Sequence, residues 1–274
     1  MKTLIKFIFV LIISTTSCFA TNRNQILVYN DQGAEGNSLK QTLSMFSKLA
    51  RKRYEIKTIN AQTLLETDWE AKTALLVIPG GADIPYTQKL NGKGNEKISS
   101  YVKNGGNFLG ICAGGYYGAN NIEFAKGTEL EVTGKRELSF YPGKAIGPIL
   151  ANYVYNSHEG ARAARLKWHQ SNLPIVTVYY NGGGYFSESN KYNNVTVLAQ
   201  YEDYPKKPAA IVKMKIGNGT AILSGVHFEY AYQHLDEKDK YLHSIIPELK
   251  QSNKQRHLLV TQLLKEFNLE AICE

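Results

Sequence analysis

The chain has 274 residues, a length that fits one large domain or two small ones. Apolar residues make up 43% and charged residues 20% of it, proportions typical of a globular protein with a hydrophobic core rather than of a disordered chain. The formal net charge is +8, but the basic residues are scattered, with short clusters only at 51–53 and 206–207, so no nucleic-acid partner is expected.

The N-terminus has the features of a signal peptide. Two lysines precede the unbroken apolar run 7–13, which is far shorter than the roughly 20 residues that a membrane-spanning helix needs. We therefore expect a signal peptide over residues 1–20, cleaved after Ala20, and a periplasmic or secreted mature protein without a stable membrane span. Lipidation at Cys18 is the alternative interpretation. The folded domain is expected over residues 21–274.

Strands and helices alternate in the first half of the chain, which predicts parallel βαβ units. Ser38 stands where it can cap the first helix, whose apolar residues then fall on one face. The predicted strands cover 25–29, 54–59, 74–78 and 107–111, and the predicted helices cover 38–52, 61–66 and 96–103.

The second half is predicted to be richer in strands. Residues 217–219 have the Gly-Asn-Gly composition of a hairpin turn between two of these strands. We interpret the whole as one α/β domain with a β-rich insertion and C-terminal helices. The expected elements are extended segments at 129–141 and 146–155, a short helix at 161–168, strands at 175–180, 195–201, 209–216 and 220–226, and two helices within 239–267.

A cysteine stands where the fourth predicted strand meets the next helix, in the sequence Gly110-Ile111-Cys112-Ala113-Gly114. A nucleophile on a tight strand-to-helix turn needs neighbours without bulky side chains. The backbone N–H groups of the helix that starts at Ala113 favour the thiolate form of such a cysteine. We expect Cys112 to be a free, catalytic thiol and Cys273, near the C-terminus, to have no role.

A histidine and a glutamate follow the last predicted strand, in Val226-His227-Phe228-Glu229. A thiol nucleophile needs a general base, and that base needs an acceptor that orients it. Side chains at positions i and i+2 of an extended segment point the same way, so Glu229 is placed to orient His227. The sequence therefore predicts a triad of Cys112, His227 and Glu229.

A glycine-rich turn, Pro79-Gly80-Gly81-Ala82-Asp83, follows the third predicted strand. Ligands of open α/β sheets bind at the carboxyl ends of the strands. We expect the backbone N–H groups of Gly81 and Ala113 to hold an oxyanion, with Gly80, Asp83 and Gly114 also lining the substrate site.

These motifs resemble class I glutamine amidotransferase-like domains, which pair a Gly-x-Cys-x-Gly elbow with a distant His-x-Glu. Residues 78–86, 108–118 and 179–184 are similar to one branch in particular, the N-terminal domain of biotin–protein ligases and its stand-alone bacterial relatives. The resemblance implies a flavodoxin-like parallel sheet flanked by helices. It also implies that Asn181, Gly182 and Gly183 lie near the substrate pocket.

The sequence departs from this pattern in two ways. Phe228 stands where amidotransferases usually have a proline between the histidine and the glutamate. No Gly-Arg-Gly adenylate loop is present, so we do not expect the chain to ligate biotin itself.

Two functional hypotheses follow. The first is an exported cysteine hydrolase that acts on a small amide without a metal or an organic cofactor. The second is a non-catalytic module that binds a small ligand and retains the fold. The remaining histidines lack the spacing of metal ligands and are expected on the surface. The substrate and the oligomeric state are left open.

Overall fold

The computed structural model describes residues 23–271. The expected signal peptide at 1–20, the alternative lipidation site at Cys18, and Cys273 lie outside the described residues. Within residues 23–271, no helix has both the length and the apolar character needed to cross a membrane.

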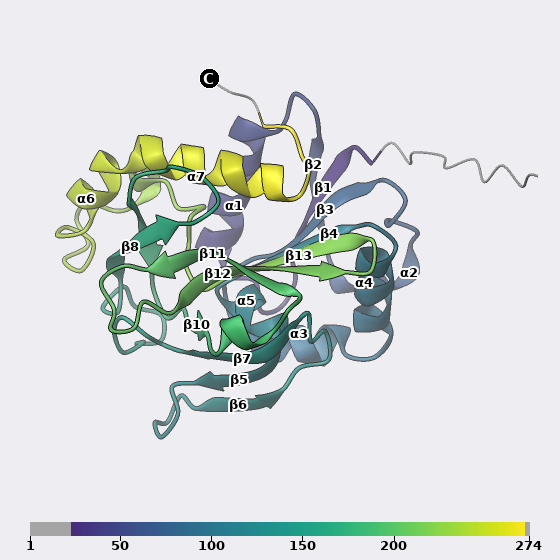
Figure 1. The fold of residues 1–274 in the computed structure, drawn as a ribbon, viewed down its shortest axis with the longest axis horizontal. Coiled ribbons are helices and arrows are strands. Elements are labelled where there is room, and N and C mark those ends of the chain that lie inside the picture. Colours follow the sequence, from purple (N-terminus) through teal and green to yellow (C-terminus); the bar gives the residue numbers. More distant parts are fainter. Residues whose placement is uncertain (1–22, 272–274) are drawn as a thin grey trace, which may run out of the picture.

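The centre of the fold is a parallel sheet made of β1 (Gln25–Tyr29), β2 (Glu55–Ile59), β3 (Thr73–Ile78), β4 (Asn107–Ile111) and β13 (Gly219–Ser224). The strands lie in the order β2-β1-β3-β4-β13, and every neighbouring pair in this series is parallel. This is the flavodoxin-like order 2-1-3-4-5, with β13 as the fifth strand. The α/β fold class is confirmed, and the twisted fan of strands is visible in Figure 1.

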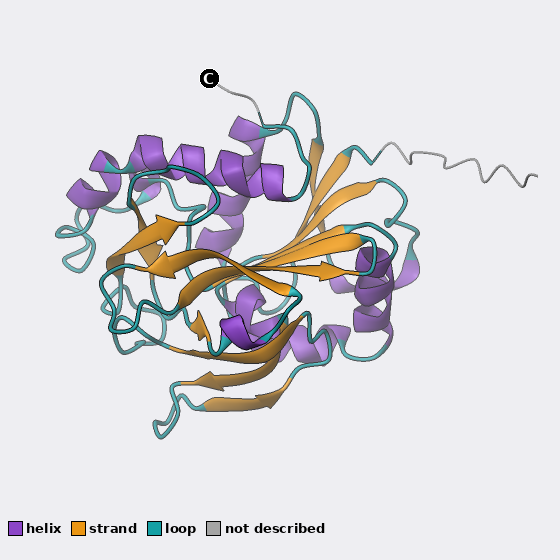
Figure 2. Ribbon diagram, in the orientation of Figure 1, coloured by secondary structure: helices purple, strands orange, loops and turns teal. Residues whose placement is uncertain are grey.

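Helices cover both faces of this sheet, as Figure 2 shows. Side chains alternate along each strand, so in β1 Ile26 and Val28 face one helical layer while Leu27 and Tyr29 face the other. The first layer contains α1 (Gly36–Leu49) and α7 (Asn253–Glu266), with α6 (Ile246–Gln251) just before α7. The second contains α2 (Ala61–Glu66), α3 (Asp83–Leu90), α4 (Lys93–Lys103) and α5 (Ala113–Tyr117).

An antiparallel extension continues the sheet beyond β13. From β13 the order is β12, β10, β7, β5 and β6, while β11, β8 and β9 branch from β12. The pairs are antiparallel except for β5 with β7. The bounds are β5 Ala119–Phe124, β6 Val132–Lys135, β7 Tyr141–Gly147, β8 Arg162–Trp168, β9 Val176–Tyr180, β10 Tyr185–Phe186, β11 Val195–Tyr201 and β12 Ala209–Ile216.

Several local predictions are wrong. Residues 161–168 form strand β8 rather than a helix, because Ala164, Leu166 and Trp168 alternate with exposed residues and are buried in the core. The segment 146–155 leaves β7 at once and is mostly loop. The helix expected to start at Ala113 does start there, and it ends at Tyr117, two residues before β5 begins.

The helix α3 was not predicted, although Asp83 in its first turn is a typical helix-start residue. The helix α1 begins earlier than predicted, since Glu35 caps it by accepting from the N–H groups of Asn37 and Ser38. The C-terminal region 239–245 consists of turns, and its helices start at Ile246.

Candidate active site

Cys112 occupies a strained turn between β4 and α5. Its φ is +50° and its ψ −105°, a backbone conformation that a non-glycine residue adopts only where the surrounding structure enforces it. The Cys112 N–H donates to the carbonyl of Ser224 on the neighbouring strand at 2.8 Å. A Cβ atom at Gly110 would lie 2.2 Å from the Gly114 carbonyl oxygen, and one at Gly114 would lie 2.1 Å from that of Ile78. The glycines on both sides therefore permit the elbow.

His227 and Glu229 leave β13 side by side. The Nδ1 atom of His227 lies 2.7 Å from Oε1 of Glu229, and both side chains are buried. The His227 N–H donates to the carbonyl of Tyr179 on β9 at 2.9 Å, which fixes the backbone of the pair. The structure thus brings together the two side chains that the His-x-Glu spacing predicted to interact.

The other side of the His227 ring faces Cys112. Burial alone would lower the pKa of His227, but the charge of Glu229, the charge of Cys112 and hydrogen bonds to both side chains hold this pKa well above its ordinary value. A histidine between a carboxylate and a thiol is placed as a general base for that thiol would be. Cys112 itself is a free, buried thiol.

Ser38 completes a buried hydrogen-bond network that the sequence did not reveal. Its hydroxyl donates to Oε1 of Glu229 at 3.0 Å and accepts from the N–H of Gly80 at 2.9 Å. Ser38 was predicted to cap α1, whereas it lies inside that helix and faces the site. The network joins the turn after β3 to the acid that orients His227.

The turn after β3 lies against the histidine. A Cβ atom at Gly80 would approach Cε1 of His227 to 2.6 Å, so only glycine fits there. The N–H of Gly80 is taken by Ser38, and the N–H of Gly114 donates to the carbonyl of Pro79 at 3.2 Å. These two residues shape the site without offering N–H groups to a ligand.

Gly81 and Ala113 differ from Gly80 and Gly114 in this respect. Gly81 and Ala34 face each other in an isolated antiparallel bridge. The hydrogen bonds of this bridge are made by the residues on either side of them and not by the N–H of Gly81. Ala113 is the first residue of α5, where a backbone N–H has no partner within the helix. The predicted oxyanion role of these two N–H groups stays a prediction.

The turn at 181–184 comes close to Cys112, the candidate nucleophile. The Cys112 thiol lies 3.8 Å from the carbonyl oxygen of Asn181. Gly182 has a φ of +75°, and its carbonyl accepts from the Tyr116 hydroxyl at 3.3 Å. A Cβ at Gly183 would lie 1.7 Å from the carbonyl oxygen of Gly225, so this turn packs backbone against backbone on the segment that leads to His227.

Asp83 is engaged in a buried ion pair. Its Oδ2 accepts from Nε of Arg136 at 2.7 Å, and both side chains are nearly inaccessible. Burial raises the pKa of Asp83 even though the positive charge of Arg136 acts against this. The carboxylate thus anchors the glycine-rich turn to the segment after β6, and its predicted contact with a substrate stays a prediction.

Phe228, which replaces the usual proline, does not prevent the His–Glu contact. Its side chain is buried in the core next to α7, and its carbonyl accepts from Nη1 of Arg256 at 3.0 Å. Burial lowers the pKa of Arg256 to about 10, against the opposing influence of the Glu229 charge. Arg256 stays positively charged at neutral pH and holds the backbone between the two catalytic candidates.

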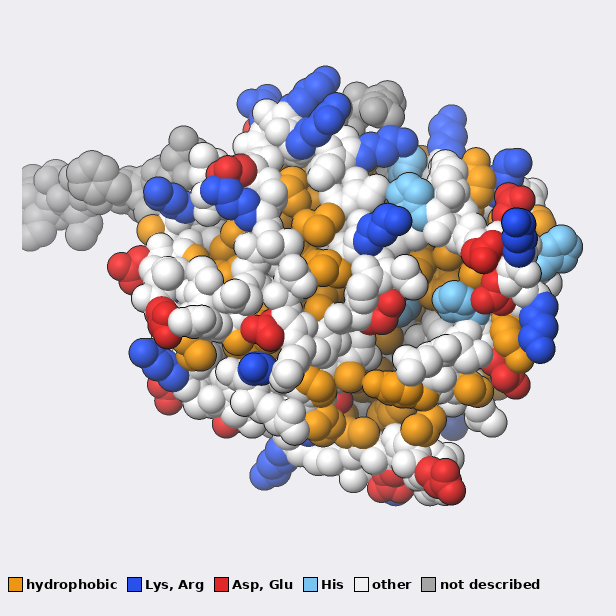
Figure 3. Space-filling view, turned by 180° about the vertical axis from the view of Figure 1, so that it is seen from behind, with side chains coloured by type: hydrophobic (Ala, Val, Ile, Leu, Met, Phe, Trp, Pro, Cys, Tyr) orange, Lys and Arg blue, Asp and Glu red, His pale blue; other side chains and the backbone are white. Residues whose placement is uncertain are grey.

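An aromatic row leads from the site to the surface. Tyr116, Phe124, Tyr153 and Tyr155 follow one another at centroid distances of 5.7, 5.7 and 6.3 Å. Tyr153 lies so close to Gly182 that a Cβ there would come within 2.6 Å of its ring, whereas Tyr155 is 61% exposed. The space-filling view from behind shows apolar side chains gathered in a band across the lower part of that face (Figure 3).

No group of three or more His, Cys, Asp or Glu side chains within residues 23–271 is arranged to hold a metal ion.

The fold and the site define an α/β protein with a cysteine at a strand–helix elbow and a buried His–Glu pair beside it. A family model described as "Biotin-protein ligase, N terminal" matches residues 24–273. The chain therefore belongs to the biotin–protein ligase N-terminal family.

The relatives differ in how much of their length this chain spans. It is 38% identical over 222 residues to a biotin–protein ligase of Schizosaccharomyces pombe, covering 78% of this chain and 35% of that protein. It is 39% identical over 213 residues to an uncharacterized protein of Chlamydia muridarum, covering 76% of this chain and 82% of that protein. The chain thus spans about a third of the S. pombe ligase.

A solved structure with a similar fold is a catalytic mutant of Gan42B, a GH42 beta-galactosidase from G. stearothermophilus. Its TM-score is 0.50 at 13% identity, over 92% of this chain and 31% of that chain. At this identity the likeness shows the fold alone.

Proposed function

We propose that the protein is a cysteine-dependent hydrolase of small amides. The observation that carries this proposal is the buried series of contacts from Cys112 through His227 to Glu229. In such a series the imidazole accepts the thiol proton while the carboxylate fixes its orientation. The strained elbow at Cys112 and the N–H groups beside it support the same assignment.

The reaction transfers an acyl group to Cys112 and then to water. The thiol gives its proton to His227, and Sγ attacks the carbonyl carbon to form a C–S bond. The N–H groups of Gly81 and Ala113 stabilise the oxyanion. The C–N bond breaks as His227 returns the proton to the leaving amine. Water, losing a proton to His227, then cleaves the thioester, which releases a carboxylic acid and restores the thiol.

The pH dependence of iodoacetamide alkylation at Cys112 tests the proposal. The wild-type thiol should react rapidly well below about pH 8, and His227→Ala should abolish this reactivity. His243→Ala, which removes an exposed histidine outside the site, is the matched control and should leave it unchanged. A thiol that reacts like an ordinary cysteine, with a pKa of about 8.5, and is indifferent to His227 would overturn the triad.

The alternative function is a non-catalytic module that binds a small ligand. It is favoured by the burial of Cys112 and His227, which are only 8% and 5% exposed, and by a cavity that other residues line. The alkylation experiment separates the two functions, because a binding module does not require an activated thiol.

We also infer export of the protein, on the basis of the sequence pattern of residues 1–20. A mature N-terminus at Thr21, measured by intact mass after expression with the leader, supports this, and a retained leader contradicts it. The name of the S. pombe relative refers to ligation of biotin, and this chain spans 35% of that protein.

A further inference from the structure

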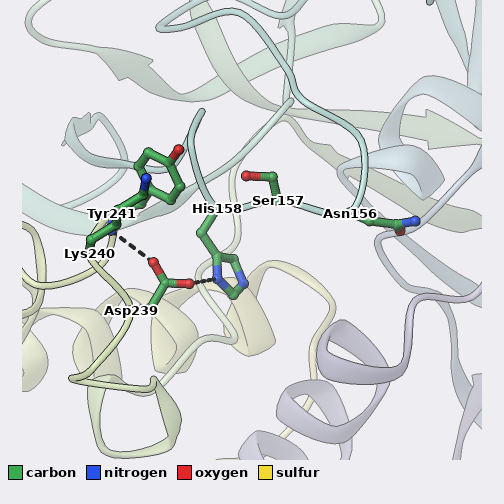
Figure 4. Close-up of a pocket in the computed structure, with 6 residues that line it drawn as sticks. All are labelled: Asn156, Ser157, His158, Asp239, Lys240 and Tyr241. Carbon is green, nitrogen blue, oxygen red and sulfur yellow. Dashed lines mark hydrogen bonds and ion pairs between the residues drawn. The ribbon is translucent and has the colours of Figure 1, made fainter.

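A cavity of about 400 Å³ lies between two segments that the proposed reaction does not use. One wall is residues 156–158, in the loop between β7 and β8, and the other is residues 239–241, ahead of α6. Figure 4 shows the two segments facing each other. The volume is within the range of small-ligand sites, about 300–1,000 Å³.

The walls are held in place by polar contacts. His158 Nδ1 lies 2.7 Å from Oδ2 of Asp239, and Oδ1 of Asp239 accepts from the Tyr241 N–H at 2.8 Å. The hydrogen bond from His158 contributes most to lowering the pKa of Asp239, so this carboxylate is ionised at neutral pH. The Tyr241 hydroxyl in turn donates to Glu159 at 3.1 Å. Both oxygens of Asp239 are thus occupied by the wall itself.

Besides the second ring nitrogen of His158, the groups left to face a ligand are one cation and two neutral polar side chains. The Nζ atom of Lys240 lies 4.6 Å from the centroid of the Tyr241 ring, a cation–π contact on an exposed residue. Asn156 offers an amide and Ser157 a hydroxyl. This set fits a carboxylate next to peptide-like hydrogen-bonding groups.

The cavity and the nucleophile are separated by a single residue. The side-chain amide of Asn181 donates to the carbonyl of Ser157 at 3.0 Å, while the carbonyl of Asn181 lies 3.8 Å from the Cys112 thiol. Asn181 therefore connects the loop that lines the cavity to Cys112.

The cavity lies on the histidine side of the nucleophile. The Tyr179 ring is 5.8 Å from the His227 ring and stacks on Tyr230 at 4.4 Å. Tyr179 and Tyr230 share a buried cluster with Leu242, the residue that follows the cavity wall 239–241, so this wall lies on the His227 side. His227 is the group that protonates a leaving amine, which places the cavity where that amine departs.

We propose that this cavity is the leaving-group subsite of the hydrolase, and that the substrate is an amide whose leaving amine is an amino acid or short peptide with a free carboxylate. The inference rests on the proposed function. Ammonia, the leaving group of a simple primary amide, would reach none of the lining side chains. A carboxylate at Lys240 and peptide groups at Asn156 and Ser157 would use the cavity to position the scissile bond.

Binding to the catalytically inert Cys112→Ala chain tests this subsite apart from turnover. Isothermal titration calorimetry would compare γ-glutamylglycine, its C-terminal amide and glutamine, which share the γ-glutamyl amide and differ only on the leaving side. Adding Lys240→Met removes the charge and the cation–π contact with Tyr241 but keeps an unbranched side chain. Lys238→Met, at an exposed lysine two residues away, is the matched control.

We expect γ-glutamylglycine to bind about ten- to a hundredfold more tightly than the other two probes, and Lys240→Met alone to remove that difference. Asn156→Gly should weaken the binding of γ-glutamylglycine as well. Glycine suits the φ of +54° at this position, so the variant removes the amide without straining the backbone. Equal affinity for the three probes, or equal effects of the two lysine variants, would overturn the subsite. An unactivated thiol in the alkylation experiment, together with Lys240-dependent binding here, would instead refute only the hydrolase.

Discussion

Replacing Ser38 with alanine tests the buried hydrogen-bond network behind His227, the proposed catalytic base. The Ser38 hydroxyl is 1% exposed and links the N–H of Gly80 to Oε1 of Glu229 through hydrogen bonds of 2.9 and 3.0 Å. Alanine removes a hydrogen bond to a charged carboxylate, worth about 1.5–3 kcal/mol, and leaves a buried N–H donor without its acceptor, at a cost of about 1–3 kcal/mol. The two losses share one site, so they are not simply additive.

We therefore expect Ser38→Ala to lower the free energy of unfolding by about 3 kcal/mol, measured by urea denaturation at pH 7. Ser44→Ala, on the partly exposed side of the same helix, is the matched control. It should change stability by less than about 0.5 kcal/mol, because alanine is the better helix former. If Ser38→Ala stays within the range of this control, the network does not stabilise the site and the reasoning fails.

Three further predictions concern the same region. Gly80→Ala should slow alkylation of Cys112 at least tenfold, because the new Cβ would lie 2.6 Å from His227. Asp83→Asn should cost about 3–5 kcal/mol by leaving Arg136 buried and unpaired, whereas Asn at the exposed Asp203 should cost less than about 1 kcal/mol. The raised pKa of His227 adds stability that is complete below its ordinary value of 6.5 and is lost as the pH rises through the folded value. Urea titrations across this range should show that loss in the wild type, and His227→Gln should remove it.

The parts of the fold that the sequence predicts are those with local signals. The buried runs of β1, β3 and β4 and the elbow at Cys112 depend on neighbouring residues, and all were located correctly. Strand β8 was missed because Ala, Arg, Leu and Lys favour helices, whereas antiparallel pairing with β9 and β11 makes residues 162–168 a strand. Tertiary pairing overrides local preference there.

The contacts of the candidate site also fall into two kinds, those with a signal in the local sequence and those without one. The His227–Glu229 contact could be predicted because two residues of one extended segment carry it. Ser38 meets Glu229 across 191 positions, and Asp83 meets Arg136 across 53, so neither contact leaves a pattern in the local sequence. Such partners become visible only when the parallel sheet brings the ends of β3, β4 and β13 to one edge.

The charges around Glu229 explain why phenylalanine is tolerated between it and His227. Proline would restrict the backbone at this position through its ring, whereas here the guanidinium of Arg256 holds the Phe228 carbonyl from outside. The buried Oε2 atom of Glu229 has no hydrogen-bond partner among the described residues. Arg256 and His227 both interact electrostatically with this carboxylate. Arg256 therefore fixes the backbone between His227 and Glu229, and the contact between these two side chains persists with phenylalanine in the place of proline.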